Sequence, residues 1–149
     1  MAVTVSLREV RDSDLDFIFD LQRDPASVEM AAVPSRDRET FDAHWVKIRA
    51  DPETFLRIVV DDEVPVGNAM SFVRDGYREV GYWIDRSHWG RGIASDALRL
   101  LVEELPRPLS GVVAAHNAAS RRVLEKHGFV LQERMTGDDG VLALRFVLD

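Results

Sequence analysis

The feature that most constrains this chain is a glycine-rich turn that joins a strand pattern to a helix pattern. Residues 77–84 form a strand pattern that ends in the apolar, aromatic run Gly-Tyr-Trp-Ile at 81–84, and Gly90 and Gly92 follow closely. The next apolar residues share one helical face: Ala94, Leu98, Leu101 and Leu105. Glycines ahead of a helix allow close backbone approach, and the unpaired N–H groups of a first helical turn attract anions. The turn is therefore predicted to bind a phosphate or pyrophosphate group.

Two common phosphate sites fit this turn poorly. A P-loop needs Lys and then Ser or Thr after its last glycine, but Ile93 and Ala94 follow Gly92. A dinucleotide fingerprint needs a third glycine, where this chain has Ser95, and an acidic residue about 20 positions later. Residues 112–115 offer no carboxylate there. A nucleotide-dependent enzyme is kept as a third hypothesis, and a plain strand-to-helix connection is the simplest alternative.

Two segments resemble motifs of one enzyme family. Residues 89–94 (Trp-Gly-Arg-Gly-Ile-Ala) resemble the acyl-coenzyme A loop of the GNAT acetyltransferases, Gln/Arg-x-x-Gly-x-Gly/Ala, in the variant of the RimJ/RimL branch. Residues 117–129 match that branch's Asn-x-x-Ser-x-x-Val-Leu-Glu-Lys-x-Gly-Phe at every fixed position. Alone, the second segment would read as an ordinary helix with an Asn N-cap and a Gly after its end. Two motifs in order are more specific than one, and the resemblance spans residues 77–129.

The resemblance and the periodicity predict the same fold. The chain is expected to form one domain, residues 1–149, of the α/β (α+β) class with a mixed sheet of about seven strands flanked by four helices. The strands are expected at 3–7, 55–60, 64–73, 77–84, 109–116, 129–133 and 141–148. The helices are expected at 12–24, 35–50, 94–105 and 117–128, and residues 26–33 fit either a helical turn or a loop. Strands 77–84 and 109–116 should be parallel neighbours, splayed apart as in the GNAT fold.

The resemblance implies acetyl-CoA as the acyl donor and CoA as the product. The pyrophosphate is expected on the N–H groups of residues 90–94, and the pantetheine arm beside the backbone of residues 82–84. The predicted cofactor-binding residues are Tyr82, Trp83, Ile84, Trp89, Gly90, Arg91, Gly92, Ile93, Ala94, Ser95, Asn117, Ser120 and Arg122.

Acetyl transfer to an amine also needs proton transfers. The amine must lose a proton before it attacks, and the departing thiolate benefits from a proton donor. The tyrosine that serves many GNAT enzymes as the acid falls at Leu124, which cannot donate. Ser120 matches the serine used in the RimL branch and is the predicted acid, although hydrogen bonding at the helix start is its simpler role. Glu79 is the predicted base, with an exposed cross-strand pairing partner as the alternative.

Composition narrows the function further. The net charge of −7 argues against nucleic-acid binding and is compatible with an amine-bearing acceptor. The chain has no cysteine, no apolar run near the roughly 20 residues of a membrane span and no secretion-signal pattern, so a cytoplasmic protein is expected. Its four histidines lack metal-ligand spacing, and no Gly-x-Ser-x-Gly elbow occurs. We therefore expect no metal, no membrane partner and no serine-hydrolase chemistry.

The function predicted from these residues is N-acetyl transfer by direct attack in a ternary complex. The acceptor is expected to be a primary amine, either a protein N-terminus or a small molecule, entering between the first two helices and the hairpin 64–84. The main alternative is a non-catalytic acyl-CoA-binding or regulatory module on the same fold, which the missing tyrosine would permit. The protein is expected to be a monomer or a homodimer.

Overall fold

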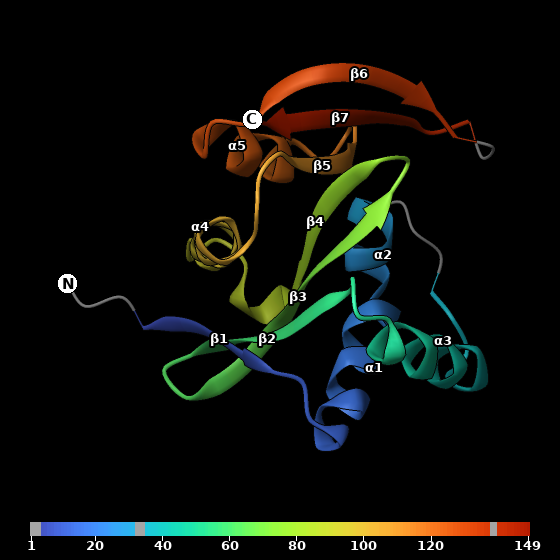
Figure 1. Ribbon diagram of the computed structural model, residues 1–149. Coiled ribbons are helices and arrows are strands. Elements are labelled where there is room, and N and C mark those ends of the chain that lie inside the picture. Colours follow the sequence, from blue (N-terminus) through green and yellow to red (C-terminus); the bar gives the residue numbers. More distant parts are fainter. Residues whose placement is uncertain (1–3, 32–34, 138–139) are drawn as a thin grey trace.

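The computed structural model describes residues 4–31, 35–137 and 140–149 (Figure 1). Residue 3 of the first predicted strand, residues 32–33 of the segment predicted as a helical turn or a loop, and residues 138–139 of a predicted turn lie outside these ranges. The described strands are β1 (Val5–Glu9), β2 (Phe55–Asp61), β3 (Val64–Arg74), β4 (Tyr77–Ile84), β5 (Leu109–Ala114), β6 (Val130–Thr136) and β7 (Leu142–Leu148). The described α-helices are α1 (Leu15–Arg23), α2 (Pro25–Ala31), α3 (Arg38–Ala50), α4 (Ile93–Glu104) and α5 (Ala118–Lys126). The predicted fold class is confirmed.

The strands form one seven-stranded sheet in the order β1-β2-β3-β4-β5-β7-β6. Every neighbouring pair is antiparallel except β4 and β5, which are parallel as predicted. These two strands pair only at Arg78 with Leu109 and at Glu79 with Ser110, although both continue for several residues. In Figure 1, β5, β7 and β6 accordingly turn away from β1 to β4. The sheet is therefore split along most of the length of β4.

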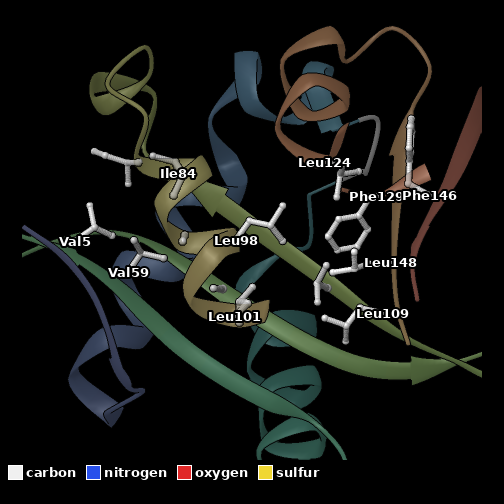
Figure 2. Packing of buried hydrophobic residues seen from close by; sticks show 14 of the residues in the cluster. Val5, Val59, Ile84, Leu98, Leu101, Leu109, Leu124, Phe129, Phe146 and Leu148 are labelled. Carbon is white, nitrogen blue, oxygen red and sulfur yellow. The ribbon is translucent and has the colours of Figure 1, made fainter. Parts of the chain in front are cut away.

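Helices cover both faces of the sheet. Ile18 of α1 and Phe41 and Trp45 of α3 pack on β2 in one buried cluster. On the other face, α4 and α5 bury apolar side chains against the strands (Figure 2). That larger cluster includes Leu98, Leu101, Leu124, Phe129, Leu109, Phe146 and Leu148. Burying such apolar area is the main stabilising contribution to a domain of this size.

The described residues contain five α-helices rather than the four predicted. Pro25, expected only to stop α1, also begins α2, because proline suits the first position of a helix. Asp24 caps this helix, since its carboxylate accepts hydrogen bonds from both the backbone N–H and the hydroxyl of Ser27. Helix α3 is likewise capped by Asp37, which accepts from the N–H of Thr40. Capping carboxylates therefore set both helix starts, and α2 is placed beside the split in the sheet.

Candidate functional site

A turn with two left-handed glycines leads from β4 into α4. Gly90 has φ +80° and Gly92 has φ +76°, a backbone region that other residues rarely adopt. Gly92 is the N-cap of α4, so no side chain caps the first N–H groups of that helix. The indole N–H of Trp89 donates to the carbonyl oxygen of Ile84 at 2.9 Å, which fastens the turn to the end of β4. The turn therefore presents bare amides beside the split in the sheet.

A cavity of about 390 Å³, here called the first cavity, lies against this turn. Its walls come from α2, the end of β4, the turn before α4, the start of α4 and one face of α5. It is lined by Ser27, Met30, Tyr82, Trp83, Ile84, His88, Trp89, Gly90, Gly92, Ile93, Ala94, Ser95, Asn117, Ala119, Ser120, Arg122, Val123 and Lys126. All the predicted cofactor-binding residues line it except Arg91, which is exposed. The split thus brings two sequence motifs together around one space.

Sequence reasoning missed several residues of the first cavity. Ser27 and Lys126 had no predicted ligand role, and Met30 lies on α2, a segment for which the sequence left a helical turn and a loop open. Lys126 follows Arg122 by four positions, so both cations lie on one face of α5. That spacing was a readable signal for Lys126. No comparable signal existed for Ser27, because its place depends on how α2 packs.

Two hydrogen bonds tie the start of α5 to its surroundings. Asn117, 9% exposed, accepts from the backbone N–H of Ser120 at 3.2 Å and so acts as the helix cap. The hydroxyl of Tyr82 donates to Oγ of Ser120 at 3.3 Å, which bridges β4 and α5 across the split. Burial raises the pKa of the Tyr82 hydroxyl, and its hydrogen bond to Ser120 only partly opposes this. Tyr82 therefore stays protonated at neutral pH.

A second cavity of about 720 Å³ opens on the side of α1 and α3. Its apolar wall includes Ile18, Leu21, Trp45, Ile48, Met70 and Phe72. Four residues line both cavities: Tyr82, Trp83, Asn117 and Ser120. The indole Nε1 of Trp83 is buried and has no hydrogen-bond partner among the described residues. A buried donor of this kind normally has a partner, so a ligand carbonyl would suit it.

Glu79 lines the second cavity, but both its oxygens are occupied. The carboxylate is 2% exposed; Oε1 accepts from Arg145 at 3.0 Å, and Oε2 lies 2.8 Å from Nη2 of Arg74. Arg145, 3% exposed, also donates to Oγ of Ser110 at 2.7 Å. This network joins β4, β5 and β7 at the last place where β4 and β5 pair. Glu79 is therefore a cross-strand partner, buried rather than exposed, and its role as a base stays a prediction.

Two further residues bear on proton transfer. Leu124 is 2% exposed and packs so tightly that a Cβ placed on Gly111 would lie 2.7 Å from its Cδ2. The position of the family's tyrosine is thus part of the core. His44 of α3 lines the second cavity, and burial, together with Arg36 and Lys47, lowers its pKa. Its imidazole is therefore neutral at pH 7 and able to accept a proton.

Other kinds of site find no support in the described part of the chain. Residues 4–31, 35–137 and 140–149 contain no group of three or more His, Asp or Glu side chains arranged to hold a metal ion. None of the helices in these ranges is both long and apolar enough to cross a membrane.

Comparisons with known proteins agree with this geometry. A family model described as an acetyltransferase (GNAT) domain matches residues 4–130. The probable N-acetyltransferase YjcK of Bacillus subtilis (strain 168) is 43% identical over 56 residues, which cover 34% of this chain and 30% of that protein. The match therefore spans less than a third of this relative's own length.

Solved structures share the fold over nearly the whole chain. A Vibrio cholerae spermidine N-acetyltransferase, in complex with CoA and spermine, has a TM-score of 0.85 at 17% identity and covers 97% of this chain and 95% of its own. The aminoglycoside acetyltransferase AAC(6')-Ib, in complex with coenzyme A, has a TM-score of 0.82 at 22% identity, with 97% and 94% covered. RimL, a ribosomal L7/L12 alpha-N-protein acetyltransferase in complex with coenzyme A, has a TM-score of 0.82 at 17% identity, with 99% and 94% covered.

Proposed function

Because this chain belongs to the acetyltransferase (GNAT) domain family, we propose that it transfers an acetyl group from acetyl-CoA to a primary amine. The observation that carries the proposal is the first cavity, where the glycine turn, the unpaired end of β4 and the start of α5 meet. The turn supplies bare amides for phosphates, and the unpaired backbone of β4 supplies polar groups for an extended arm. We also infer that the protein belongs to the RimJ/RimL-like branch of the family, that it acts in the cytoplasm, and that it is a monomer or a homodimer.

The acyl donor would fill the first cavity. Its pyrophosphate would lie on the first N–H groups of α4, with Arg122 and Lys126 as nearby cations. Its pantetheine arm would follow residues 82–84. The Ile84 carbonyl already accepts a hydrogen bond from Trp89, so it is the backbone group least available to the arm. The thioester would then reach Tyr82, Trp83, Asn117 and Ser120, the four residues shared with the second cavity.

The reaction is a nucleophilic substitution at the thioester carbonyl. The amine nitrogen forms a bond to this carbon, the carbon–sulfur bond breaks, and the sulfur leaves with the electron pair. The amine loses one proton and the sulfur finally carries one, so protons balance. Ser120 is the proposed donor to the sulfur, and the buried N–H of Trp83 is free to donate to the acyl oxygen. Glu79 and the neutral His44 are the candidate bases in the second cavity.

The second cavity favours an acceptor amine that carries an apolar group. Only two carboxylates line this cavity among the described residues, Asp51 and Glu79, and both already have partners. A polycation such as spermine or an aminoglycoside would therefore find only Asp51 there as an ion-pair partner, because Glu79 is already paired with two arginines, although the related structures bind such amines. Trp45, Met70 and Phe72 instead offer apolar contact. A protein N-terminus or an amine with an apolar substituent fits this wall better.

The deciding experiment measures release of free thiol from acetyl-CoA in the presence of a panel of amines. The panel would include peptides with apolar first residues, apolar amines, polyamines and aminoglycosides. Turnover with the first two classes is expected, together with a rise in melting temperature on adding CoA, because a ligand that binds only the folded state stabilises it. Saturable CoA binding without turnover for any amine would instead support the non-catalytic module, which the leucine in place of the family's tyrosine at position 124 would permit.

A further inference from the structure

The contact between Tyr82 and Ser120 joins the two walls of the split through side-chain hydroxyls. Tyr82 belongs to β4 and Ser120 to α5, 38 positions later, and their oxygens are 3.3 Å apart. Both residues are half-buried and both line the first and the second cavity. A hydroxyl pair at this boundary lies where the acyl group must pass from donor to acceptor.

The direction of the hydrogen bond determines what Ser120 can do. A serine hydroxyl has one proton to donate and two lone pairs to accept with. Tyr82 donates to the Ser120 oxygen, so the proton of Ser120 is left for another acceptor. The backbone of Ser120 is held independently, because its N–H donates to Asn117. Burial raises the pKa of Tyr82, so the phenol keeps the proton that it needs in order to donate.

Resting on the proposed function, we propose that Tyr82 is a positioning residue that aims the Ser120 proton at the sulfur of the acyl donor. As the carbon–sulfur bond breaks, Ser120 donates a hydrogen bond to the developing thiolate, and Tyr82 holds the serine oxygen in place. The base in the second cavity takes the proton that the amine loses and releases it to solvent, and the thiolate takes one proton from solvent. Neither hydroxyl is changed over the cycle, so atoms and charge balance.

The packing of Leu124 explains why the hydroxyl partner of Ser120 comes from β4 and not from α5. Leu124 is buried in the core and fills the space beside Gly111, so position 124 offers no hydroxyl to the split. Tyr82 approaches from the opposite wall and meets α5 one turn earlier, at Ser120. The two hydroxyls at this boundary therefore come from one strand residue, Tyr82, and one helix residue, Ser120.

The chain has two tyrosines, which gives a matched pair of variants. Tyr82→Phe removes only the hydroxyl and is expected to lower kcat about fivefold, the effect of one hydrogen bond, with KM for acetyl-CoA unchanged. Tyr77→Phe is the control, because the ring of Tyr77 that packs against Arg145 is retained. Ser120→Ala should lower kcat about 100-fold, and adding Tyr82→Phe to it should cause no further loss.

Three kinetic results would overturn the proposal. They are an unchanged kcat in Tyr82→Phe, a rise in KM alone, and a fivefold loss that persists in the Ser120→Ala background. The rise in KM alone would mean that the pair merely holds the cofactor arm.

A spectroscopic titration separates this proposal from the proposed function. In Tyr77→Phe protein, Tyr82 is the only tyrosine, and its phenolate absorbance reports its ionisation. We expect burial to hold the pKa of Tyr82 above the ordinary value of about 10, and we expect this pKa to change in the double variant with Ser120→Ala, because the hydroxyl contact is lost. Coupled titration without any turnover would overturn the catalytic role and the proposed function but leave the contact. Turnover without coupled titration would overturn the positioning role alone.

Discussion

The two edges of β4 differ sharply, and the difference shows how this sheet makes room for a ligand. On one edge β4 pairs with β3 from Tyr77 to Ile84 without a break. Contact there is so close that a Cβ on Gly67 would lie 2.3 Å from the carbonyl oxygen of Trp83. On the other edge β4 pairs with β5 at two residues only. The same strand is thus closed on one side and open on the other, and the cavities lie on the open side.

The open edge begins where the network of Glu79, Arg145 and Ser110 ends the pairing of β4 with β5. Arg145→Met would remove the donor to two buried oxygens and leave Glu79 with Arg74 alone. We expect the free energy of unfolding to fall by about 3 kcal/mol, the cost of breaking a buried pair. Denaturant titration measures this change in the free energy of unfolding.

Arg134→Met serves as the matched control for this change. Arg134 is exposed on β6, and its replacement should change the unfolding free energy by less than about 0.5 kcal/mol. Equal losses in the two variants would mean that the network does not hold the closed part of the β4–β5 pair together.

A second test addresses the open edge itself by changing the charge of α5. The double change Arg122→Glu with Lys126→Glu places two carboxylates in the first cavity, both on exposed positions. We expect KM for acetyl-CoA to rise about tenfold, because phosphates are repelled, while kcat stays within a factor of about two. Steady-state kinetics at low salt show this most clearly.

The comparison variant for that test is Arg99→Glu, on α4 outside the cavity linings. It should leave KM for acetyl-CoA nearly unchanged. If both variants raised KM alike, overall charge rather than the first cavity would account for the effect.

The smallest expected effect concerns His127, whose ring Nε2 lies 2.9 Å from Oγ of Ser95 and links α5 to α4 on the open side. Burial, with help from Lys126, lowers the pKa of His127 below its unfolded value near 6.5. The unfolded chain therefore takes up the proton first, so stability is lost as pH falls from neutral through the lowered pKa. Thermal melting between neutral and mildly acidic pH should show this slope.

His127→Gln should reduce the slope but not abolish it. The remainder is expected from His44, whose pKa is also lowered by burial. An unchanged slope in His127→Gln would show that the link between α4 and α5 does not depend on a neutral imidazole.

Sequence signals within a few residues made the open edge of β4 predictable, whereas contacts between residues far apart in the chain could not be predicted. The bounds of β4 and the cap of α5 by Asn117 were read directly from the sequence, since apolar runs and capping residues act within a few positions. The partners of Glu79 were not, because Arg145 lies 66 positions away and no pattern links the two. Tyr82 was assigned only for its backbone, and its hydroxyl contact with Ser120 depends on the angle at which the strands part.

Helix α2 shows a different limit. Pro25 is both the end of one helix and the start of the next, and the sequence signal for a stop is the same as the signal for a start. Only the packing of α2 beside β5 decides between them, and with it the contribution of Ser27 and Met30 to the first cavity.

The wall that the two cavities share has a consequence for the order of events in a catalytic cycle. Donor and acceptor would arrive through different openings and meet only at residues 82, 83, 117 and 120, so neither blocks the other's route. The chain also has no cysteine to carry the acyl group between half-reactions. Initial-rate lines at several donor concentrations should therefore intersect rather than run parallel, as in random sequential kinetics.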